Sequence, residues 1–192
     1  MKVVILAGGF GTRISEYTKV IPKPMIKILG KPILFHIMSH YAKYGFKDFY
    51  ITLGYKGEII KRYFKKKKLS WNINLIETGK NTMTGGRLKK LQKSIGKETF
   101  MMTYGDGLSN INLKKLLNFH KKNKSQITLT AVRPRNKYGI IKINNNRITS
   151  LDDSKSKKSN VYINGGYFVI SHKAIKLIKN NSTFWENEPL KR

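Results

Sequence analysis

The sequence predicts an α/β fold in which a largely parallel sheet is flanked by helices and followed by a β-rich second half. Short apolar runs alternate with amphipathic stretches as far as Val132, and glycine-rich segments follow several of these runs. Beyond that point short strands and one final helix are expected. Because parallel neighbouring strands need a crossover helix, the alternation places a ligand site beyond the carboxyl ends of the strands.

The first predicted strand, Lys2–Leu6, is a continuous apolar run that ends just before a pair of glycines, as buried strands entering a loop do. The first predicted helix, Lys31–Tyr44, has Pro32 near its start, apolar residues at helical spacing and a stop at Gly45. By the same reasoning, further strands are expected at Asp48–Leu53, Asn72–Ile76, Phe100–Thr103 and Gln126–Val132, and further helices at Lys56–Phe64, Arg87–Ile95 and Asn112–Lys122.

The second half of the chain carries short β-rich runs separated by Asn- and Ser-rich turns. Strands are expected at Gly139–Ile143, Arg147–Leu151 and Gly166–Ser171, with a final helix at Lys173–Lys179. A chain of 192 residues with 40% hydrophobic content has the length of one domain and can bury one substantial core. Residues 1–192 are therefore predicted to form a single domain.

The chain is strongly basic, with a formal net charge of +29 at pH 7. A field this positive attracts anions such as nucleotides and sugar phosphates, and taken alone it would also suit nucleic acid. Base-reading sites usually favour Arg, however, and here Lys far outnumbers Arg and is spread over the whole length. The densest run, Lys65–Lys68, follows a predicted helix and is interpreted as a solvated turn. No nucleic-acid partner is expected.

The chain contains no cysteine, which excludes a disulfide framework, a thiolate nucleophile and a thiolate metal site. It has no apolar run long enough to span a bilayer, and its N-terminus enters the first strand without the apolar core of a signal peptide. A cytoplasmic protein without a membrane partner is therefore expected.

A glycine-rich segment, LAGGFGTR at residues 6–13, follows the first strand. Its glycines leave backbone N–H groups uncovered by side chains, so a phosphate can approach several donors at once. The dinucleotide fingerprint would need a glycine at the position of Ile14, and the Gly-Lys-Ser/Thr of a Walker A loop is absent. The segment is interpreted as an anion cradle, with a tight turn that binds no ligand as the alternative.

A lysine between two prolines, Lys23 in the sequence PKPM at 22–25, follows this segment. Prolines restrict the backbone on both sides and are expected to hold the chain extended, so Lys23 projects from a stiff support. Such a lysine suits the binding of a phosphate group. A solvated lysine in an ordinary loop is the alternative.

An aspartate, Asp106, ends a predicted strand between Gly105 and Gly107. This is the open setting in which a carboxylate meets Mg²⁺ while phosphate oxygens and water supply the other ligands. Asp106 is therefore the candidate metal ligand. A capping or turn role is the alternative.

Taken together, LAGGFGTR and the downstream PKP resemble the signature of the nucleoside-triphosphate:sugar-1-phosphate nucleotidyltransferases. Members that use CTP and glucose 1-phosphate are similar in further segments: GKPILFHIM at 30–38, GYKGEIIKRYF at 54–64, TGKNTMTGGRLK at 78–89, TYGDG at 103–107 and INGGYFV at 163–169. The resemblance implies a Rossmann-like nucleotidyltransferase fold. It also implies formation of CDP-glucose and pyrophosphate, with Mg²⁺ as cofactor, in the biosynthesis of cell-surface polysaccharide such as the lipopolysaccharide O-antigen.

The resemblance implies roles for individual residues. Arg13 would hold the departing pyrophosphate and Lys23 would offset charge on the transferring phosphate, so these two are expected to be catalytic. The main-chain groups of Thr84, Gly85 and Gly86 are expected to read the base. The full nucleotide-binding set is Leu6, Ala7, Gly8, Gly9, Gly11, Thr12, Arg13, Lys23, Thr84, Gly85, Gly86 and Asp106. Because the attacking phosphate oxygen is already anionic, catalysis should rest on alignment and electrostatics.

Sugar-phosphate binding is expected near the C-terminal half, with a turn at Asn164–Gly166. The residues expected to take part are Gly139, Asp153, Lys155, Asn164 and Gly165. Relatives carry Glu-Lys-Pro where residues 151–156 read LDDSKS. They also have a longer segment in place of Lys65–Trp71, so whether this chain forms a homo-oligomer stays open. They also continue beyond Arg192 with a second metal-binding aspartate. Weak turnover is therefore expected, and the alternatives are a nucleotide-binding remnant or the use of another nucleoside triphosphate or sugar phosphate.

Overall fold

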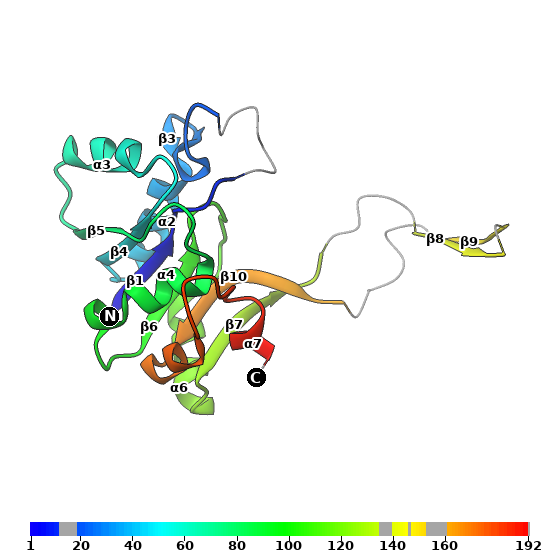
Figure 1. Ribbon diagram of the computed structural model, residues 1–192. Helices are drawn as coiled ribbons and strands as arrows, with labels where there is room; N and C mark the ends of the chain where they lie inside the picture. The colour runs from blue at the N-terminus through cyan, green and yellow to red at the C-terminus, as the bar shows by residue number, and fades with distance from the viewer. Residues whose placement is uncertain (12–18, 135–139, 146, 153–160, 192) are drawn as a thin grey trace. The chain divides into compact units, whose positions relative to one another are not determined.

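The computed structural model describes residues 1–11, 19–134, 140–145, 147–152 and 161–191 (Figure 1). It divides into two compact units, Met1–Thr128 with Gly166–Arg192, and Leu129–Gly165. The single-domain interpretation stays a prediction. Within the described ranges, no helix combines the length and apolar character that crossing a membrane requires.

The main sheet has six strands in the order β5-β4-β1-β6-β10-β7. Their bounds are β1 Lys2–Leu6, β4 Asp48–Leu53, β5 Asn72–Glu77, β6 Phe100–Tyr104, β7 Ile127–Val132 and β10 Ile163–Ile170. The pairs β1 with β4, β1 with β6, and β4 with β5 are parallel, whereas β10 runs antiparallel to β6. The predicted α/β class with a largely parallel mixed sheet is therefore confirmed.

Two short ladders and a set of helices complete the described chain. The ladders pair β2 (Lys27–Ile28) with β3 (Lys31–Pro32) and β8 (Ile140–Asn144) with β9 (Arg147–Asp152). The helices are α2 Ile33–Lys43, α3 Gly57–Lys65, α4 Thr84–Lys90, α5 Gln92–Ile95, α6 Leu113–Asn123 and α7 Glu188–Lys191, with 3₁₀ helices η2 Lys23–Met25 and η3 His172–Leu177. The side chains of Lys65–Lys68 are exposed, as expected of a solvated run.

Strand β1 is apolar and buried from Val3 to Leu6 because both faces of the sheet are covered. Val3 and Ile5 belong to a core closed by α2, α3 and α6, whereas Val4 and Leu6 belong to a second core closed by α4, α5 and η3. Trp185 completes the second core and is fully buried. Each buried aliphatic side chain contributes about 1.5–3 kcal/mol of hydrophobic stabilisation. Two such layers fix the sheet and therefore the loops at its carboxyl edge.

Several local predictions were wrong. The predicted helix Lys173–Lys179 is the 3₁₀ helix η3, because Ile178 turns to an extended conformation and reaches the second core. The predicted helix Arg87–Ile95 begins earlier, at Thr84, and is divided into α4 and α5 at Leu91. Lys23 lies at the start of η2 and not in extended chain, since Pro24 has the backbone angle that suits a helical first turn.

Candidate active site

A cavity of about 350 Å³ opens at the carboxyl ends of β1 and β6 in the first unit. Its lining residues are Leu6, Ala7, Gly8, Gly9, Phe10, Gly11, Lys23, Pro24, Lys80, Thr82, Met83, Thr84, Arg87, Tyr104, Gly105, Asp106 and Phe184. The position agrees with the rule that open α/β sheets bind ligands beyond their carboxyl edge. Among the described lining residues, three cations face one carboxylate, so the cavity suits an anion.

The glycine loop at Gly8–Gly11 forms one wall of this cavity. The carbonyl of Gly8 accepts from the N–H of Tyr55 at 3.1 Å, and the N–H of Ala7 donates to the carbonyl of Thr52 at 3.2 Å. A Cβ added at Gly9 would meet no atom within 4 Å, so the space over this residue is open to a ligand. Gly11 has a φ of 67°, a left-handed conformation that favours glycine.

Lys23 and Asp106 lie close together in the cavity. Their Nζ and Oδ2 atoms are 2.6 Å apart, and both side chains are partly exposed. The two segments are held by the N–H of Gly105, which donates to the carbonyl of Leu6 at 2.9 Å, and by packing of Gly105 against Pro24. The structure thus brings together the residues predicted from separate motifs to bind phosphate and metal.

The loop that carries Asp106 is also anchored from β10. The hydroxyl of Tyr167 donates to the carbonyl of Gly107 at 3.0 Å. Burial raises the pKa of Tyr167 to about 12, which keeps this hydroxyl protonated and able to donate at neutral pH. Asp106 therefore projects from a short loop that is fixed on both sides.

The opposite wall is built by the start of α4 and by the segment Asn181–Glu186, which packs against it. The N–H groups of Gly85 and Gly86 both donate to the carbonyl of Thr183, at 3.0 and 3.2 Å. A Cβ at Gly86 would lie 2.4 Å from the carbonyl oxygen of Asn181. These N–H groups, expected to read a base, are thus engaged by the protein's own chain, and neither glycine lines the cavity.

Glu186 ties the two parts of this wall together. Its carboxylate accepts from the hydroxyl of Thr84 at 2.7 Å and from the hydroxyl of Tyr104 at 2.6 Å. The oxygen of Thr84 in turn accepts from the N–H of Trp185 at 2.9 Å. Thr84, one of the predicted nucleotide-binding residues, is therefore fixed at the cavity edge by two polar contacts, one to Glu186 and one to Trp185.

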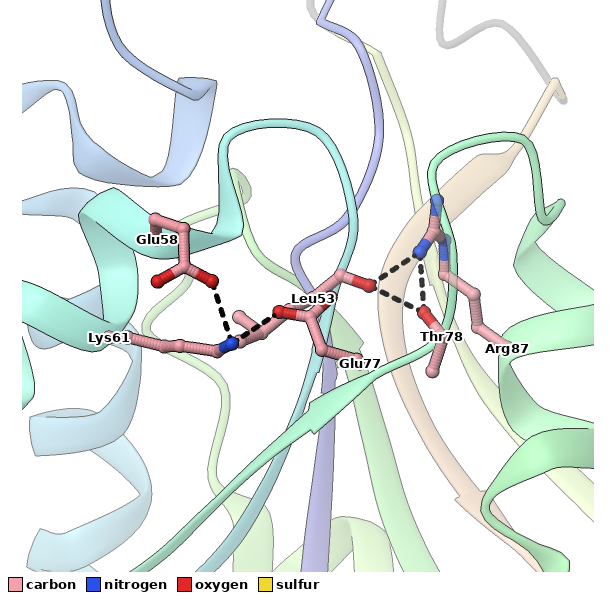
Figure 2. Close-up of polar contacts among 6 residues, drawn as sticks. All are labelled: Leu53, Glu58, Lys61, Glu77, Thr78 and Arg87. Atoms are coloured by element: carbon pink, nitrogen blue, oxygen red, sulfur yellow. Dashed lines mark hydrogen bonds and ion pairs between the residues drawn. The ribbon is translucent and has the colours of Figure 1, made fainter.

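Arg87 lies beneath the loops and is only 3% exposed. Its Nη1 donates to the carbonyl of Leu53 at 2.9 Å and to the hydroxyl of Thr78 at 2.5 Å (Figure 2). Its Nη2 donates to the carbonyl of Gly8 at 2.8 Å. Burial lowers the pKa of Arg87, yet the group stays charged at neutral pH because the pKa of arginine is so high.

A cation and two aromatic rings stand at the outer edge of the glycine loop. The ammonium of Lys80 lies 5.7 Å from the ring centre of Phe10 and 6.0 Å from that of Tyr55. The two rings are themselves 5.3 Å apart. Cation–π contacts of this kind hold a lysine near the mouth while leaving its charge available to an anion.

Residues 2–189 match the Nucleotidyl transferase family. The chain belongs to this family. A curated relative, the glucose-1-phosphate cytidylyltransferase of Salmonella typhimurium, is 43% identical over 99% of the chain and 82% of its own length. The probable glucose-1-phosphate cytidylyltransferase of Bacillus subtilis is 41% identical over 100% of the chain and 83% of its own length. The resemblance found in the sequence is thus confirmed.

A solved structure has the same fold. HddC from Yersinia pseudotuberculosis, complexed with GMP-PN, superposes with a TM-score of 0.78 and 28% identity over 100% of the chain and 85% of its own length. A fold shared over this length supports the assignment of the chain to the Nucleotidyl transferase family.

Several residues predicted for the site line the cavity, namely Leu6, Ala7, Gly8, Gly9, Gly11, Lys23, Thr84 and Asp106. Thr12 and Arg13 lie outside the described residues, as do Gly139, Asp153 and Lys155. Asn164 and Gly165 belong to the second unit and lie within β10, so the turn predicted at Asn164–Gly166 is wrong. A Cβ at Gly165 would lie 2.6 Å from the hydroxyl of Thr130, and this close packing explains why glycine occurs inside the strand.

Other residues of the site were missed by sequence reasoning: Phe10, Lys80, Arg87, Tyr104, Phe184 and Glu186. The sequence contained a weak indication that Arg87 and Glu186 are important, since arginine and acidic residues are both scarce in this lysine-rich chain. Nothing near Glu186 in the sequence indicated that its partners would be Thr84 and Tyr104.

The fit of a magnesium ion can be judged from the donors present. Among the described lining residues, Asp106 supplies the single carboxylate, and the described chain has no cluster of three or more His, Asp or Glu suited to a metal. Mg²⁺ is commonly held by one or two carboxylates together with substrate phosphates. The donor set therefore fits a metal that enters with a polyphosphate, and Mg²⁺ stays a prediction.

Proposed function

We propose that this chain transfers a cytidylyl group from CTP to α-D-glucose 1-phosphate, giving CDP-glucose and pyrophosphate. The observation that carries the proposal is the meeting of the glycine loop, Lys23 and Asp106 in one cation-rich cavity. The choice of CTP and glucose 1-phosphate rests on the 43% identity to the Salmonella typhimurium glucose-1-phosphate cytidylyltransferase.

The reaction needs no protein nucleophile. A phosphate oxygen of glucose 1-phosphate attacks the α-phosphorus of CTP, and the bond from that phosphorus to the oxygen bridging to the β-phosphate breaks, so that pyrophosphate leaves with the electron pair. Negative charge converges on the α-phosphate during this step, and a cation held nearby stabilises it. Lys23 takes this role when the triphosphate draws its ammonium away from Asp106.

Asp106 has a complementary role. With Lys23 on the phosphates, Asp106 would be the residue that holds Mg²⁺, and the ion would supply positive charge to the phosphate oxygens. In this proposal the glycine loop binds the triphosphate through main-chain N–H groups, and Thr84, which lines the cavity, is assigned to the base. The assignment of Arg13, and of Gly139, Asp153, Lys155, Asn164 and Gly165 to the sugar phosphate, is part of the same proposal.

The test presents CTP, UTP, dTTP, ATP and GTP separately, each with glucose 1-phosphate and Mg²⁺, and measures pyrophosphate release. We expect release with CTP to exceed that with the other nucleotides. Preference for another nucleotide would overturn the base assignment and leave the chemistry standing. Binding of CTP without any pyrophosphate would instead identify a nucleotide-binding remnant.

The site is tested by Lys23→Ala with Lys66→Ala as the matched control. Both changes remove one lysine, but Lys66 lies in the exposed run and is distant from every cavity-lining residue in sequence. Loss of an electrostatic contact to the reacting phosphate lowers kcat by about 100- to 1,000-fold, whereas the control should keep its rate. Equal rates for the two variants would show that Lys23 has no part in the reaction.

A further inference from the structure

Arg87 is a buried cation whose recorded hydrogen-bond partners are all uncharged. They are the carbonyl oxygens of Gly8, Leu53 and Lys80 and the hydroxyl of Thr78. Burying a charge is costly unless its surroundings compensate it, and proteins seldom keep such a group without a use for it. The position of this cation therefore needs an explanation beyond packing.

Burial lowers the pKa of Arg87, and the carboxylate whose charge opposes this lowering forms its ion pair with another cation. Glu77 exerts this effect, yet its Oε1 is 2.8 Å from the Nζ of Lys61, which also contacts Glu58 at 2.7 Å. Figure 2 shows Glu77 directed toward Lys61, whereas Arg87 is directed toward Leu53 and Thr78. The hydrogen bonds of the Arg87 guanidinium thus go to the loops that surround it and not to this carboxylate.

One side chain joins three neighbouring strand ends. Gly8 follows β1, Leu53 ends β4, and Thr78 follows β5, and these three strands are adjacent in the sheet. Because arginine presents five donors in a rigid planar fork, it can hold several loops in one arrangement, which a lysine cannot do. The geometry is built around the guanidinium: a Cβ would lie 2.2 Å from Nη1 at Gly8 and 2.6 Å from it at Gly54.

The bond to Gly8 also fixes the next peptide group. The described backbone has no cis peptide, so the N–H of Gly9 points away from the carbonyl of Gly8. With that carbonyl held by Nη2 of Arg87 and by the N–H of Tyr55, the direction of the Gly9 N–H is set. A charged donor on the carbonyl polarises the peptide and strengthens its N–H as a donor to an anion.

We propose that Arg87 is a positioning residue for the phosphate site: it holds the glycine loop in its binding form and reinforces the Gly9 N–H through the Gly8 carbonyl. The proposal rests on the proposed function, since it assumes that this loop binds the triphosphate. Arg87 acts without touching the phosphates itself, and its loss affects the affinity for polyphosphate more than any other property of the site.

The test uses the full chain with Arg87→Met and Arg87→Lys, and inorganic tripolyphosphate as the probe in titration calorimetry. Methionine keeps the length of the side chain and removes the charge, and we expect affinity to fall by about 10- to 100-fold. Lysine keeps the charge but loses the fork, and a smaller loss of about fivefold is expected. In turnover, KM for CTP should rise while KM for glucose 1-phosphate stays unchanged.

The matched control is Lys89→Met on the same helix. Its ammonium donates to the carbonyls of Ile178 and Lys179, so this variant also loses contacts to backbone carbonyls, but Lys89 is not among the residues that line the cavity. Its stability should fall without change in tripolyphosphate affinity. A folded Arg87→Met that binds as the wild type does would overturn the proposal, and if that variant fails to fold, unchanged binding by Arg87→Lys would do so.

The outcomes separate this inference from the proposed function. A wild-type protein that binds no tripolyphosphate would contradict the phosphate site itself. Wild-type binding that survives in both Arg87 variants would leave the phosphate site in place and remove only the role of Arg87.

Discussion

Two glycine pairs, Gly8–Gly9 and Gly85–Gly86, lie beside the cavity, but they have different surroundings. The space where a side chain would stand at Gly9 is empty, whereas at Gly86 it is filled by the backbone of Asn181. Both pairs follow the same sequence rule, that glycine allows close approach of another group. In the first case the approaching group is proposed to be a ligand, and in the second it is the protein's own chain.

The difference extends to the main-chain donors. The N–H groups of Gly85 and Gly86 are both bound to the carbonyl of Thr183, and Gly85 also packs against this residue. At the glycine loop it is the carbonyl of Gly8 that is held, by Arg87 and Tyr55. A glycine-rich motif therefore identifies close approach, while only its partner decides whether the approach serves binding or packing.

The largest effect, a loss of stability, is expected for Gly86→Ala. The new Cβ would stand 2.4 Å from the carbonyl oxygen and 2.6 Å from the Cα of Asn181, and backbone atoms cannot move aside cheaply. Even after the helix propensity gained from alanine, unfolding free energy should fall by about 2 kcal/mol or more. Denaturant unfolding measures this loss, and a stability equal to the wild type would show that Asn181 does not pack there in solution.

An intermediate effect, on phosphate affinity and not on stability, is expected for the matched change Gly9→Ala. Because nothing lies within 4 Å of the added methyl group, the unfolding free energy should change by less than about 0.5 kcal/mol. The methyl group would occupy the approach to the loop, so affinity for tripolyphosphate should fall by about tenfold. Calorimetry and unfolding of the same sample check both parts. Unchanged affinity would exclude Gly9 from the phosphate site.

The smallest effect is expected for Glu186→Gln, which alters the packed wall without crowding it. The two carboxylate oxygens accept separately from Thr84 and Tyr104, and glutamine offers a single uncharged oxygen, so one hydroxyl loses its acceptor and the other is held less well. Because the side chain is only half-buried, the loss of unfolding free energy should be about 0.5–1 kcal/mol. A melting temperature identical to that of the wild type would mean that the two hydroxyls do not depend on Glu186.

The sequence by itself determined the fold class, the main strands and the glycine loop. Apolar runs such as Lys2–Leu6 and Asp48–Leu53 are buried on both faces, and that pattern is local, so it can be recognised without knowing any partner. The glycines of LAGGFGTR and Asp106 could be predicted as binding residues for the same reason. Each belongs to a short segment whose residue types by themselves indicate phosphate or metal binding.

Only the tertiary structure decided which groups meet. The strand order brings the ends of β5, β4, β1 and β6 to one edge, and there Lys23 pairs with Asp106 and Arg87 joins Gly8 to Leu53. It also places Glu186 on Thr84, a contact between residues far apart in the chain. Such contacts depend on how distant segments pack, and the free energy that selects them belongs to the whole core rather than to any short stretch of sequence.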